Sequence, residues 1–318
     1  MLTKARKLSR RFTGNRESIR RDLGLAVRHL PTLPFLAWPL RAEPEVHGEL
    51  DPRSYNSVGD MATVIYQAVV PVKRKPISSG TLVCQPDYPA QEAHPTKWFF
   101  INGIMTSPPL AIINAQEIAR AFRRPVHLIH TPTYGFAWDL WDSITARTLR
   151  KDGHLSRPAF YVVQRALEQH ERVVLVCHSQ GTIVASYIVR KLLKHPSTRH
   201  LVRRLEIYCI AGVADGLHLD PELSREAGHP VPYVEHFSNG LDFFCRIGIL
   251  AHLELTAGKV FNIAGRTGHL LNEHYIPGSV RGDYCGRQSR LYRYANGREP
   301  GAYDWSEPLA RQEEHYDI

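Results

Sequence analysis

Ser179 lies where a predicted strand meets a predicted helix. The stretch RVVLVCHSQGTIVA, residues 172–185, runs from an apolar segment through a short polar run into a helix-like pattern. A serine at such a turn can be held out as a nucleophile, provided that the residues two before and two after it are small. Cys177 and Gly181 occupy those positions. The simpler interpretation is a serine that caps the following helix.

Two backbone segments could stabilise a negatively charged oxygen beside Ser179. The N–H of Gln180 stands at the start of the predicted helix, where the helix dipole favours an anion. A second donor is expected from the loop after an earlier strand, KWFFINGIMTS, in which Gly103 and Ile104 follow Asn102. An Asn-Gly turn that binds nothing is the alternative for this stretch.

An acidic residue that could orient a histidine is expected after a later strand. The stretch YVEHFSNGLDFFCRIG ends its β-like run shortly before Asp242, whose carboxylate could accept a hydrogen bond from an imidazole and fix its tautomer. Asp242 could also be the N-cap of the next apolar segment. Asp215, one strand earlier, is the alternative acid.

The base is expected last in the chain, on the loop after the final strand. The stretch KVFNIAGRTGHLLNEHYI offers His269 and His274. We favour His269, because it comes first after the strand and follows a glycine, whereas His274 lies where a helix has begun. The chain order of serine, acid and histidine is that of one known class of hydrolase.

Strands and helices alternate along the chain, and this pattern favours a mostly parallel sheet covered by helices. Several of the apolar runs are continuous, as buried strands require. We predict strands over Ala62 to Val70, Gly80 to Gln85, Lys97 to Ile101, Val126 to Thr131, Arg172 to Cys177, Leu205 to Ala211, Tyr233 to Phe237 and Lys259 to Ile263. We predict helices over Leu110 to Phe122, Phe160 to His170, Gly181 to Lys194 and Asp242 to Leu253.

The turn at Ser179, the Asn-Gly loop, the Asn-x-x-Asp after a strand and the Gly-His before an aromatic-bearing helix resemble the α/β-hydrolase superfamily. The last two features are similar to its class 3 lipase-like branch, and Ser-Gln-Gly resembles cutinases and other serine esterases. The resemblance spans about residues 60–285. It implies a three-layer α/β-hydrolase fold, with a mostly parallel central sheet and helices on both faces. Cys177 replaces the usual glycine, and cutinase-like disulfides are absent.

The resemblance also implies a reaction: Ser179 attacks an acyl carbonyl, His269 acts as base and then acid, and Asp242 orients the imidazole. No metal or organic cofactor is required. The segment HTPTYGFAWDLWDSITA carries Tyr134, Phe136 and Trp138 where such folds insert a cap, which we place at residues 134–160. A cap would give an apolar acyl pocket, whereas aromatic packing on the core is the alternative. Asn102 and His178 are the other predicted pocket residues.

The composition describes a globular chain of 318 residues, with 43% hydrophobic and 22% charged residues. The formal net charge of +9 is concentrated in residues 1–22, which hold eight Lys or Arg and two acidic residues. The body is therefore not basic enough to indicate nucleic-acid binding. For the basic arm, a solvated tail, contact with an anionic membrane surface or partner, and an organelle presequence are all open.

Three regions follow from this pattern: a basic, proline-punctuated extension over residues 1–60, a catalytic domain over 61–290 and a tail over 291–318. We expect a cytoplasmic protein, because the sequence shows neither a secretory signal nor a transmembrane helix. The five cysteines lack any CxxC spacing and favour free thiols. The histidines form no convincing zinc site.

We therefore predict a serine esterase or lipase that cleaves a carboxylic ester, with a small-molecule or lipid acyl substrate. Acyl thioesterase and peptidase are alternatives within the same chemistry. A catalytically silent hydrolase scaffold that binds membranes or proteins is the alternative from a different class.

Overall fold

The computed structural model describes residues 20–40, 44, 46–69, 82–84, 96–131, 156–214 and 216–300. Within these ranges one sheet has the strand order β1-β3-β2-β4-β5-β6-β7. Its strands are β1 (Leu82–Cys84), β2 (Thr96–Ile101), β3 (Val126–Ile129), β4 (Arg172–His178), β5 (Leu205–Ile210), β6 (Tyr233–Asn239) and β7 (Lys259–Ile263). β1 pairs antiparallel with β3, and every other neighbouring pair is parallel.

Helices and short helical turns connect and flank these strands. The α-helices are α2 (Val58–Val69), α3 (Pro108–Phe122), α5 (Ser156–Gln169), α6 (Gly181–Lys194), α7 (Pro196–Arg199), α8 (Pro221–Ala227), α9 (Phe243–Ile247), α10 (Ile276–Arg281) and α11 (Arg290–Tyr294). The shorter turns are η1 (Leu30–Ala37), η2 (Pro52–Ser54), η3 (His200–Arg204), η4 (Ile249–Leu255), η5 (Leu271–Tyr275), η6 (Gly286–Gln288) and η7 (Ala295–Gly297). Residues 20–29 are also helical.

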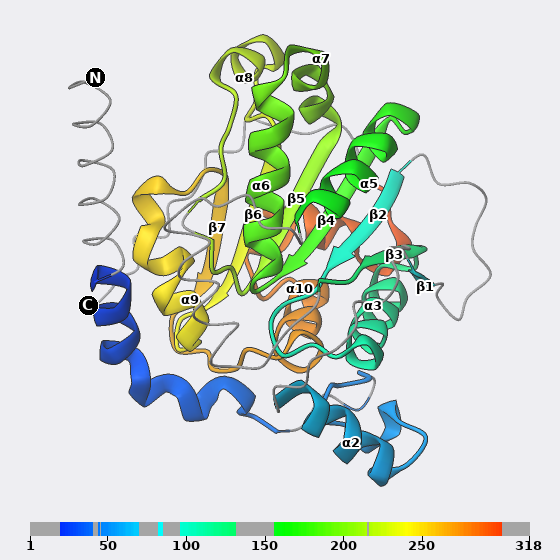
Figure 1. Ribbon diagram of the computed structural model, residues 1–318, viewed down its shortest axis with the longest axis vertical. Coiled ribbons are helices and arrows are strands. Elements are labelled where there is room, and N and C mark those ends of the chain that lie inside the picture. Colours follow the sequence, from blue (N-terminus) through cyan, green and yellow to red (C-terminus); the bar gives the residue numbers. More distant parts are fainter. Residues whose placement is uncertain are drawn as a thin grey trace, which may run out of the picture.

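The sheet is the middle of three layers (Figure 1). Alternate residues of a strand point to opposite faces, and β2 shows this directly. Trp98 and Phe100 pack into the hydrophobic cluster that includes residues of α3, α10 and α11. Phe99 and Ile101 pack into the cluster on the other face, with residues of α5 and α6. The predicted three-layer α/β fold is confirmed.

Most predicted elements are present, and α6 and β7 have the predicted bounds. The predicted strand over Ala62 to Val70 is wrong, because residues 58–69 form helix α2. Two local signals favour the helix: the Ser57 hydroxyl accepts from the N–H of Asp60 at 3.0 Å, and Asp60 lies in the first turn. The β-branched residues of this run suit a strand, but they do not forbid a capped helix.

A buried carboxylate on the sheet binds residues 289–291 at the start of α11. Glu235 on β6 is fully buried and accepts from the N–H groups of Arg290 and Leu291, at 2.6 and 3.2 Å, and from the Ser289 hydroxyl at 2.9 Å. Helix α11 therefore has its first N–H groups satisfied by a strand side chain. Leu291 and Tyr294 are fully buried in the core.

In the part of the chain that the structure describes, no helix has the length and apolar character needed to cross a bilayer.

Candidate active site

The turn between β4 and α6 holds Ser179 in a left-handed backbone conformation, with φ of 50°. Such a conformation costs a non-glycine residue about 1 to 2 kcal/mol, so its neighbours must enforce it. The N–H of Ser179 donates to Ile210 O at 2.9 Å, and Thr182 donates to Ser179 O from its N–H and from its hydroxyl, at 3.0 and 2.7 Å. The end of β5 and the first turn of α6 thereby fix the serine.

Two glycines allow the backbone segments around Ser179 to approach each other. A Cβ on Gly181 would lie 2.5 Å from Ile101 O, so only glycine lets α6 begin against the end of β2. A Cβ on Gly103 would lie 2.8 Å from Ser179 Cβ. The loop that carries Ile104 therefore lies against the serine, as the sequence predicts, and Gln180 is the N-cap of α6.

Asp242 and His269 form a pair across two neighbouring loops. Asp242 follows β6 and His269 follows β7, and these parallel strands bring both residues to one edge of the sheet. His269 Nδ1 lies 2.7 Å from Asp242 Oδ2. An ionised carboxylate only accepts hydrogen bonds, so Nδ1 carries the proton and Nε2 of the neutral imidazole is an acceptor.

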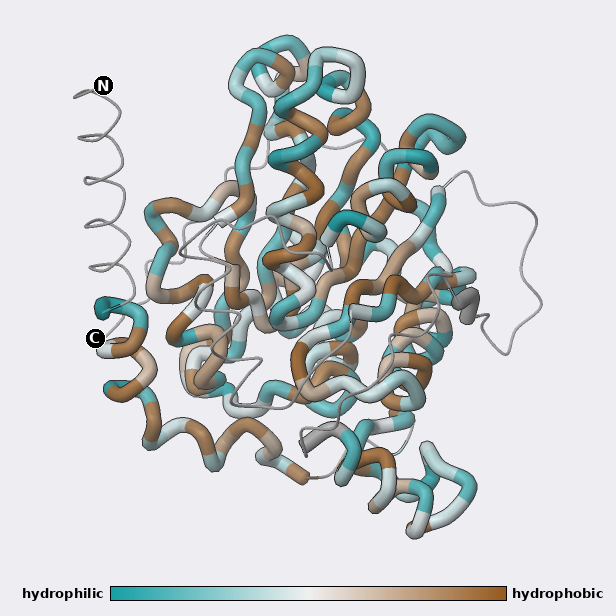
Figure 2. The backbone as a smooth tube through the Cα atoms, in the orientation of Figure 1, coloured by the Kyte–Doolittle hydropathy of each residue, from teal (hydrophilic) through white to brown (hydrophobic). Residues whose placement is uncertain are grey.

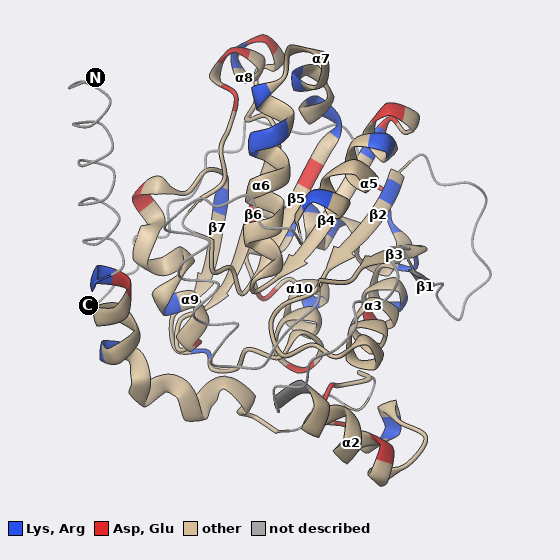
Figure 3. Ribbon diagram, viewed as in Figure 1, with Lys and Arg blue, Asp and Glu red and all other residues tan. Residues whose placement is uncertain are grey.

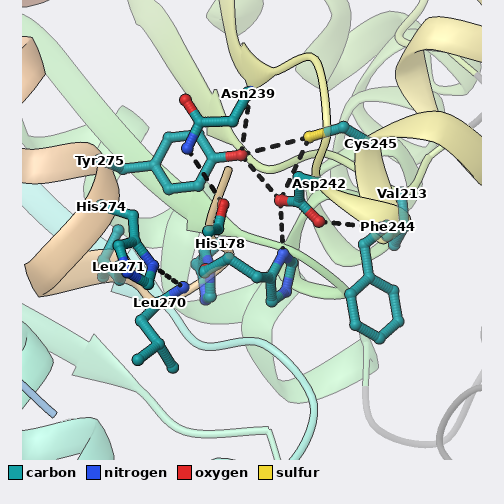
Figure 4. Close-up of polar contacts among 12 residues, drawn as sticks. His178, Val213, Asn239, Asp242, Phe244, Cys245, Leu270, Leu271, His274 and Tyr275 are labelled. Carbon is teal, nitrogen blue, oxygen red and sulfur yellow. Dashed lines mark hydrogen bonds and ion pairs between the residues drawn. The ribbon is translucent and has the colours of Figure 1, made fainter. Parts of the chain in front are cut away.

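Asp242 stays ionised although it is fully buried. Burial alone would raise the pKa of its carboxyl, but the interaction with His269 and the hydrogen bonds from Tyr275 and the N–H of Phe244 bring it below its usual value. Tyr275 donates to Oδ2 at 2.8 Å, and Phe244 N–H donates to Oδ1 at 2.9 Å. Figure 4 shows Tyr275, Cys245 and Phe244 around this carboxylate. Asp242 is thus both the N-cap of α9 and the partner of His269.

The loop that carries His269 is held from three sides. Asn239 Nδ2 donates to Thr267 O and Gly268 O, at 3.1 and 3.0 Å. The N–H of His269 donates to Leu36 O at 2.7 Å. On the third side, the His178 imidazole donates from Nε2 to His269 O at 2.9 Å.

His178 is a neutral side chain that packs on His269. Burial, with a smaller repulsion from His269, lowers the pKa of His178 to about 3. The two ring centroids are 4.9 Å apart. Because His178 directly precedes Ser179, this contact brings the serine turn beside the histidine loop. The sequence analysis predicts that His178 lines a substrate pocket. In the structure, its Nε2 is hydrogen-bonded to His269 O.

Three buried polar atoms of this site lack a hydrogen-bond partner in the described part of the chain: Ser179 Oγ, His269 Nε2 and His178 Nδ1. Ser179 is only 1% exposed. Buried polar groups without partners are rare in folded proteins, so each calls for an explanation, and a catalytic role is one such explanation. Ser179 and His269 are not hydrogen-bonded to each other here, and such bonds are often longer in a resting site than during reaction.

Both ring nitrogens of His274, the alternative base, are hydrogen-bonded to the backbone, so neither is available to accept a proton from Ser179. Its Nδ1 accepts from the N–H of Leu270 at 3.0 Å, and its Nε2 donates to Pro39 O at 2.8 Å. Burial lowers the pKa of His274. Both ring nitrogens are therefore hydrogen-bonded to backbone groups, one of Leu270 and one of Pro39. Figure 4 shows the contact with Leu270.

Sequence reasoning did not single out three side chains that organise the site. Tyr275 binds Asp242 from η5, a one-turn π-helix, and accepts from the N–H of Asn239 at 3.1 Å. Tyr284 donates to Asn239 Oδ1 at 2.5 Å and stacks on the Tyr275 ring. Thr182, besides holding Ser179, accepts from two N–H groups of the loop after β5. A π-helix next to a candidate base is a structural signal of function that the string LNEHY does not reveal.

Asn102 joins the ends of two neighbouring strands. The Asn102 side chain exchanges hydrogen bonds with the backbone of Thr131, at 2.7 Å to its Oδ1 and 3.0 Å from its Nδ2, so the ends of β2 and β3 are locked together. The alternative acid and the predicted aromatic pocket residues lie outside the described residues; these are Asp215, Tyr134, Phe136 and Trp138. Residues 134–155 of the predicted cap also lie outside them.

Among the described residues, no group of three His, Cys, Asp or Glu side chains could hold a metal ion. Cys177, Cys209 and Cys245 are buried thiols that form no disulfide. Cys177 lies fully buried two residues before Ser179, so the turn accommodates it in place of glycine.

These features together define the fold class. A mostly parallel sheet covered on both faces, with a left-handed serine after β4, an acid after β6 and a histidine after β7, is an α/β-hydrolase fold. The resemblance stated from the sequence is therefore confirmed at the level of the fold.

Comparisons with known proteins found similarity only among solved structures, since no protein-family model and no curated protein matches the chain. An arylesterase aligns with a TM-score of 0.40 and 11% identity, covering 80% of this chain and 97% of its own. A hyperthermophilic esterase from the archaeon Pyrobaculum calidifontis gives 0.38 and 10%, covering 63% and 80%. A thermophilic carboxylesterase cloned from a metagenomic library gives 0.38 and 12%, covering 63% and 85%. At this level of likeness, these structures do not define the activity of this chain.

Proposed function

We propose that this protein is a serine hydrolase that cleaves carboxylic esters through an acyl-enzyme on Ser179. The observation that carries the proposal is that Ser179 Oγ and His269 Nε2 are both buried without a hydrogen-bond partner among the described residues, while His269 is paired with Asp242. A left-handed serine is costly to maintain, and a nucleophile explains why the fold maintains it.

In the proposed reaction Ser179 Oγ attacks the acyl carbonyl carbon while His269 Nε2 takes the hydroxyl proton. Asp242 stabilises the imidazolium that forms. The backbone N–H groups of Gln180 and of Ile104 or Gly103 bind the oxyanion of the tetrahedral intermediate. The imidazolium then protonates the alcohol as the C–O bond breaks. Water then gives a proton to His269 Nε2 as its oxygen adds to the acyl carbon. The bond from that carbon to Ser179 Oγ breaks, the carboxylic acid leaves, and the imidazolium returns the proton to Ser179 Oγ.

An apolar substrate is favoured by the side chains around the site. Phe244 lies against the His269 ring, with centroids 4.5 Å apart. It belongs to a cluster of buried apolar residues formed by Ile104, Val213, Phe243, Phe244 and Ile247. The surroundings of the proposed oxyanion loop and of the base are therefore apolar, which favours an uncharged acyl ester over a charged peptide as substrate.

Hydrolysis of p-nitrophenyl esters of increasing acyl length tests the proposal. We expect turnover that requires Ser179 and that extends beyond the acetyl ester. Acyl thioesters and p-nitroanilides serve as comparisons, and faster cleavage of either would reassign the substrate class within the same mechanism. Absence of turnover on all three would favour the silent scaffold.

A further inference from the structure

An apolar surface covers the outer side of residues 20–40. In the described part of the chain, ten large hydrophobic residues are exposed, and six of them lie in this short segment. Val27 is 62% exposed and Trp38 57% exposed. Figure 2 shows the segment as a largely hydrophobic stretch at the lower left. We call this set the outer apolar surface; it consists of Leu23, Val27, Leu30, Phe35, Trp38 and Leu40.

The inner side of the same segment is apolar too. Leu25, Ala26, Leu33 and Leu36 pack against the cluster that contains Ile104, Phe243 and Phe244. A surface helix normally shows an apolar face to the core and a polar face to water. Here the inner residues already pack on the core, so the outer apolar surface replaces the polar face that a surface helix normally shows to water. Contiguous exposed apolar patches of this kind mark sites of interaction.

The segment is fixed in place by the candidate active site. Leu36 O accepts from the N–H of His269 at 2.7 Å. Trp38 O accepts from the Thr267 hydroxyl at 2.9 Å, and Pro39 O accepts from His274 at 2.8 Å. The backbone that displays the outer apolar surface is therefore held by the loop that carries the candidate base.

Positive charge adjoins this surface. The helical residues 20–29 carry Arg20, Arg21 and Arg28 and one acidic residue, the buried Asp22, which pairs with Arg21 at 3.9 Å. η1 carries no charged residue, as Figure 3 shows. The sequence of residues 1–22 has a net charge of +6. Basic residues beside exposed leucine, phenylalanine and tryptophan side chains are the combination that binds anionic lipid surfaces.

We propose that residues 20–40 dock on an anionic phospholipid bilayer, with the outer apolar surface inserted at the boundary between headgroups and acyl chains. Tryptophan is favoured at this boundary, which suits Trp38. A symmetric dimer through the same surface is disfavoured, because an isologous interface would bring two copies of Arg20, Arg21 and Arg28 together. The docking does not depend on the proposed hydrolysis. If that hydrolysis also holds, docking would place the active site at the source of a lipid ester.

Flotation of the full chain with vesicles tests the proposal. We expect binding to phosphatidylcholine vesicles that contain phosphatidylglycerol, little binding to pure phosphatidylcholine, and weaker binding at high salt. The double variant Val27→Ser/Leu30→Ser should bind the anionic vesicles about tenfold more weakly or worse, since each buried CH₂ contributes about 0.8 kcal/mol. A second variant, Arg20→Gln/Arg28→Gln, should weaken binding on the order of tenfold at low salt.

Tyr161→Ser is the matched control. Tyr161 is 67% exposed on α5, which lies far from residues 20–40 in Figure 1, so its loss should leave vesicle binding unchanged. Circular dichroism checks that all variants fold. The proposal is overturned if the wild type does not bind anionic vesicles, or if Val27→Ser/Leu30→Ser binds as tightly as Tyr161→Ser. Light scattering that shows a dimer lost in Val27→Ser/Leu30→Ser would identify a second copy as the occupant and also overturn it.

Discussion

The hydroxyl of Tyr275 donates a hydrogen bond to Asp242 Oδ2 at 2.8 Å. The same oxygen accepts from His269, so one carboxylate oxygen is bound by both the candidate base and a tyrosine. Tyr275 is fully buried and reaches Asp242 from the π-helix that follows the histidine loop. This makes Tyr275 a positioning residue for the proposed reaction.

Tyr275→Phe should lower kcat/KM about tenfold, because a hydrogen bond to a charged group is worth about 1.5 to 3 kcal/mol. The loss should grow at acidic pH. Removing a donor that lowers the pKa of Asp242 raises that pKa, so a larger fraction of the carboxyl is protonated as the pH falls. The measurement is a pH profile of kcat/KM for ester hydrolysis.

Tyr208→Phe is the control for this profile. Tyr208 is equally buried, but its hydroxyl binds Glu206 at 2.9 Å and not Asp242. It should cost stability and leave the shape of the profile unchanged. If Tyr275→Phe and Tyr208→Phe gave the same profile, Tyr275 would have only a structural role.

Substitution of His269 and substitution of His274 should have effects of very different size on kcat. His269→Ala should reduce kcat by at least about a thousandfold, since it removes the proposed base. His274→Ala should reduce kcat about tenfold or less, because His274 only holds the backbone at Leu270 and Pro39. Single-turnover kinetics of both variants measure this, and the reverse order of effects would show that His274 is the base.

A methyl group at Gly103 should impair activity more than folding. Its Cβ would lie 2.8 Å from Ser179 Cβ, so Gly103→Ala must shift the proposed oxyanion loop. Misplaced groups in an active site commonly cost about a hundredfold in rate. Gly24→Ala is the control, because no atom lies within 4 Å of the Cβ position there. Ester hydrolysis with thermal unfolding of each variant checks this, and a fully active Gly103→Ala would remove that loop from the mechanism.

The parts of the fold that were predictable depend on local patterns. β7 and α6 were recognisable because apolar periodicity and a nearby glycine specify them within a few residues. The order of Ser179, Asp242 and His269 was readable for the same reason, since each follows the end of a strand. Parallel pairing then brings those ends to one edge of the sheet.

What sequence reasoning missed depends on contacts between distant residues. Tyr275 reaches back 33 residues to Asp242, and Asn239 binds the histidine loop almost 30 residues ahead. The packing of residues 20–40 on the core depends on the cluster around Phe244, over 200 residues away. No local pattern of side chains reports such contacts. The helix over residues 58–69 was predicted as a strand from Ala62, and the hydrogen bond from the N–H of Asp60 to the Ser57 hydroxyl at its start is seen only in the structure.

Buried neutral histidines should make stability depend on pH. Burial lowers the pKa of His236 to about 4, below the value of 6.5 for an exposed histidine. Between those two pH values the unfolded chain binds a proton at this residue that the folded chain does not bind. The free energy of unfolding therefore falls as the pH falls, by about 1.4 kcal/mol per pH unit for one such proton.

The variant His236→Gln isolates this contribution. Urea denaturation at several pH values between about 6.5 and about 4.5 should give a slope that is smaller than that of the wild type by about one proton. His178, whose pKa is lowered in the same direction, keeps its contribution in both proteins. Equal slopes would mean that His236 is protonated in the folded protein.

The central claim is that Ser179 is the nucleophile, and covalent labelling tests it most directly. A fluorophosphonate probe reacts with a serine only where a base activates it and an oxyanion site receives the phosphonyl oxygen. We predict that peptide mass spectrometry will find the adduct on Ser179, and that Ser179→Ala will not be labelled. An adduct on another residue, or labelling that persists in Ser179→Ala, would contradict the account.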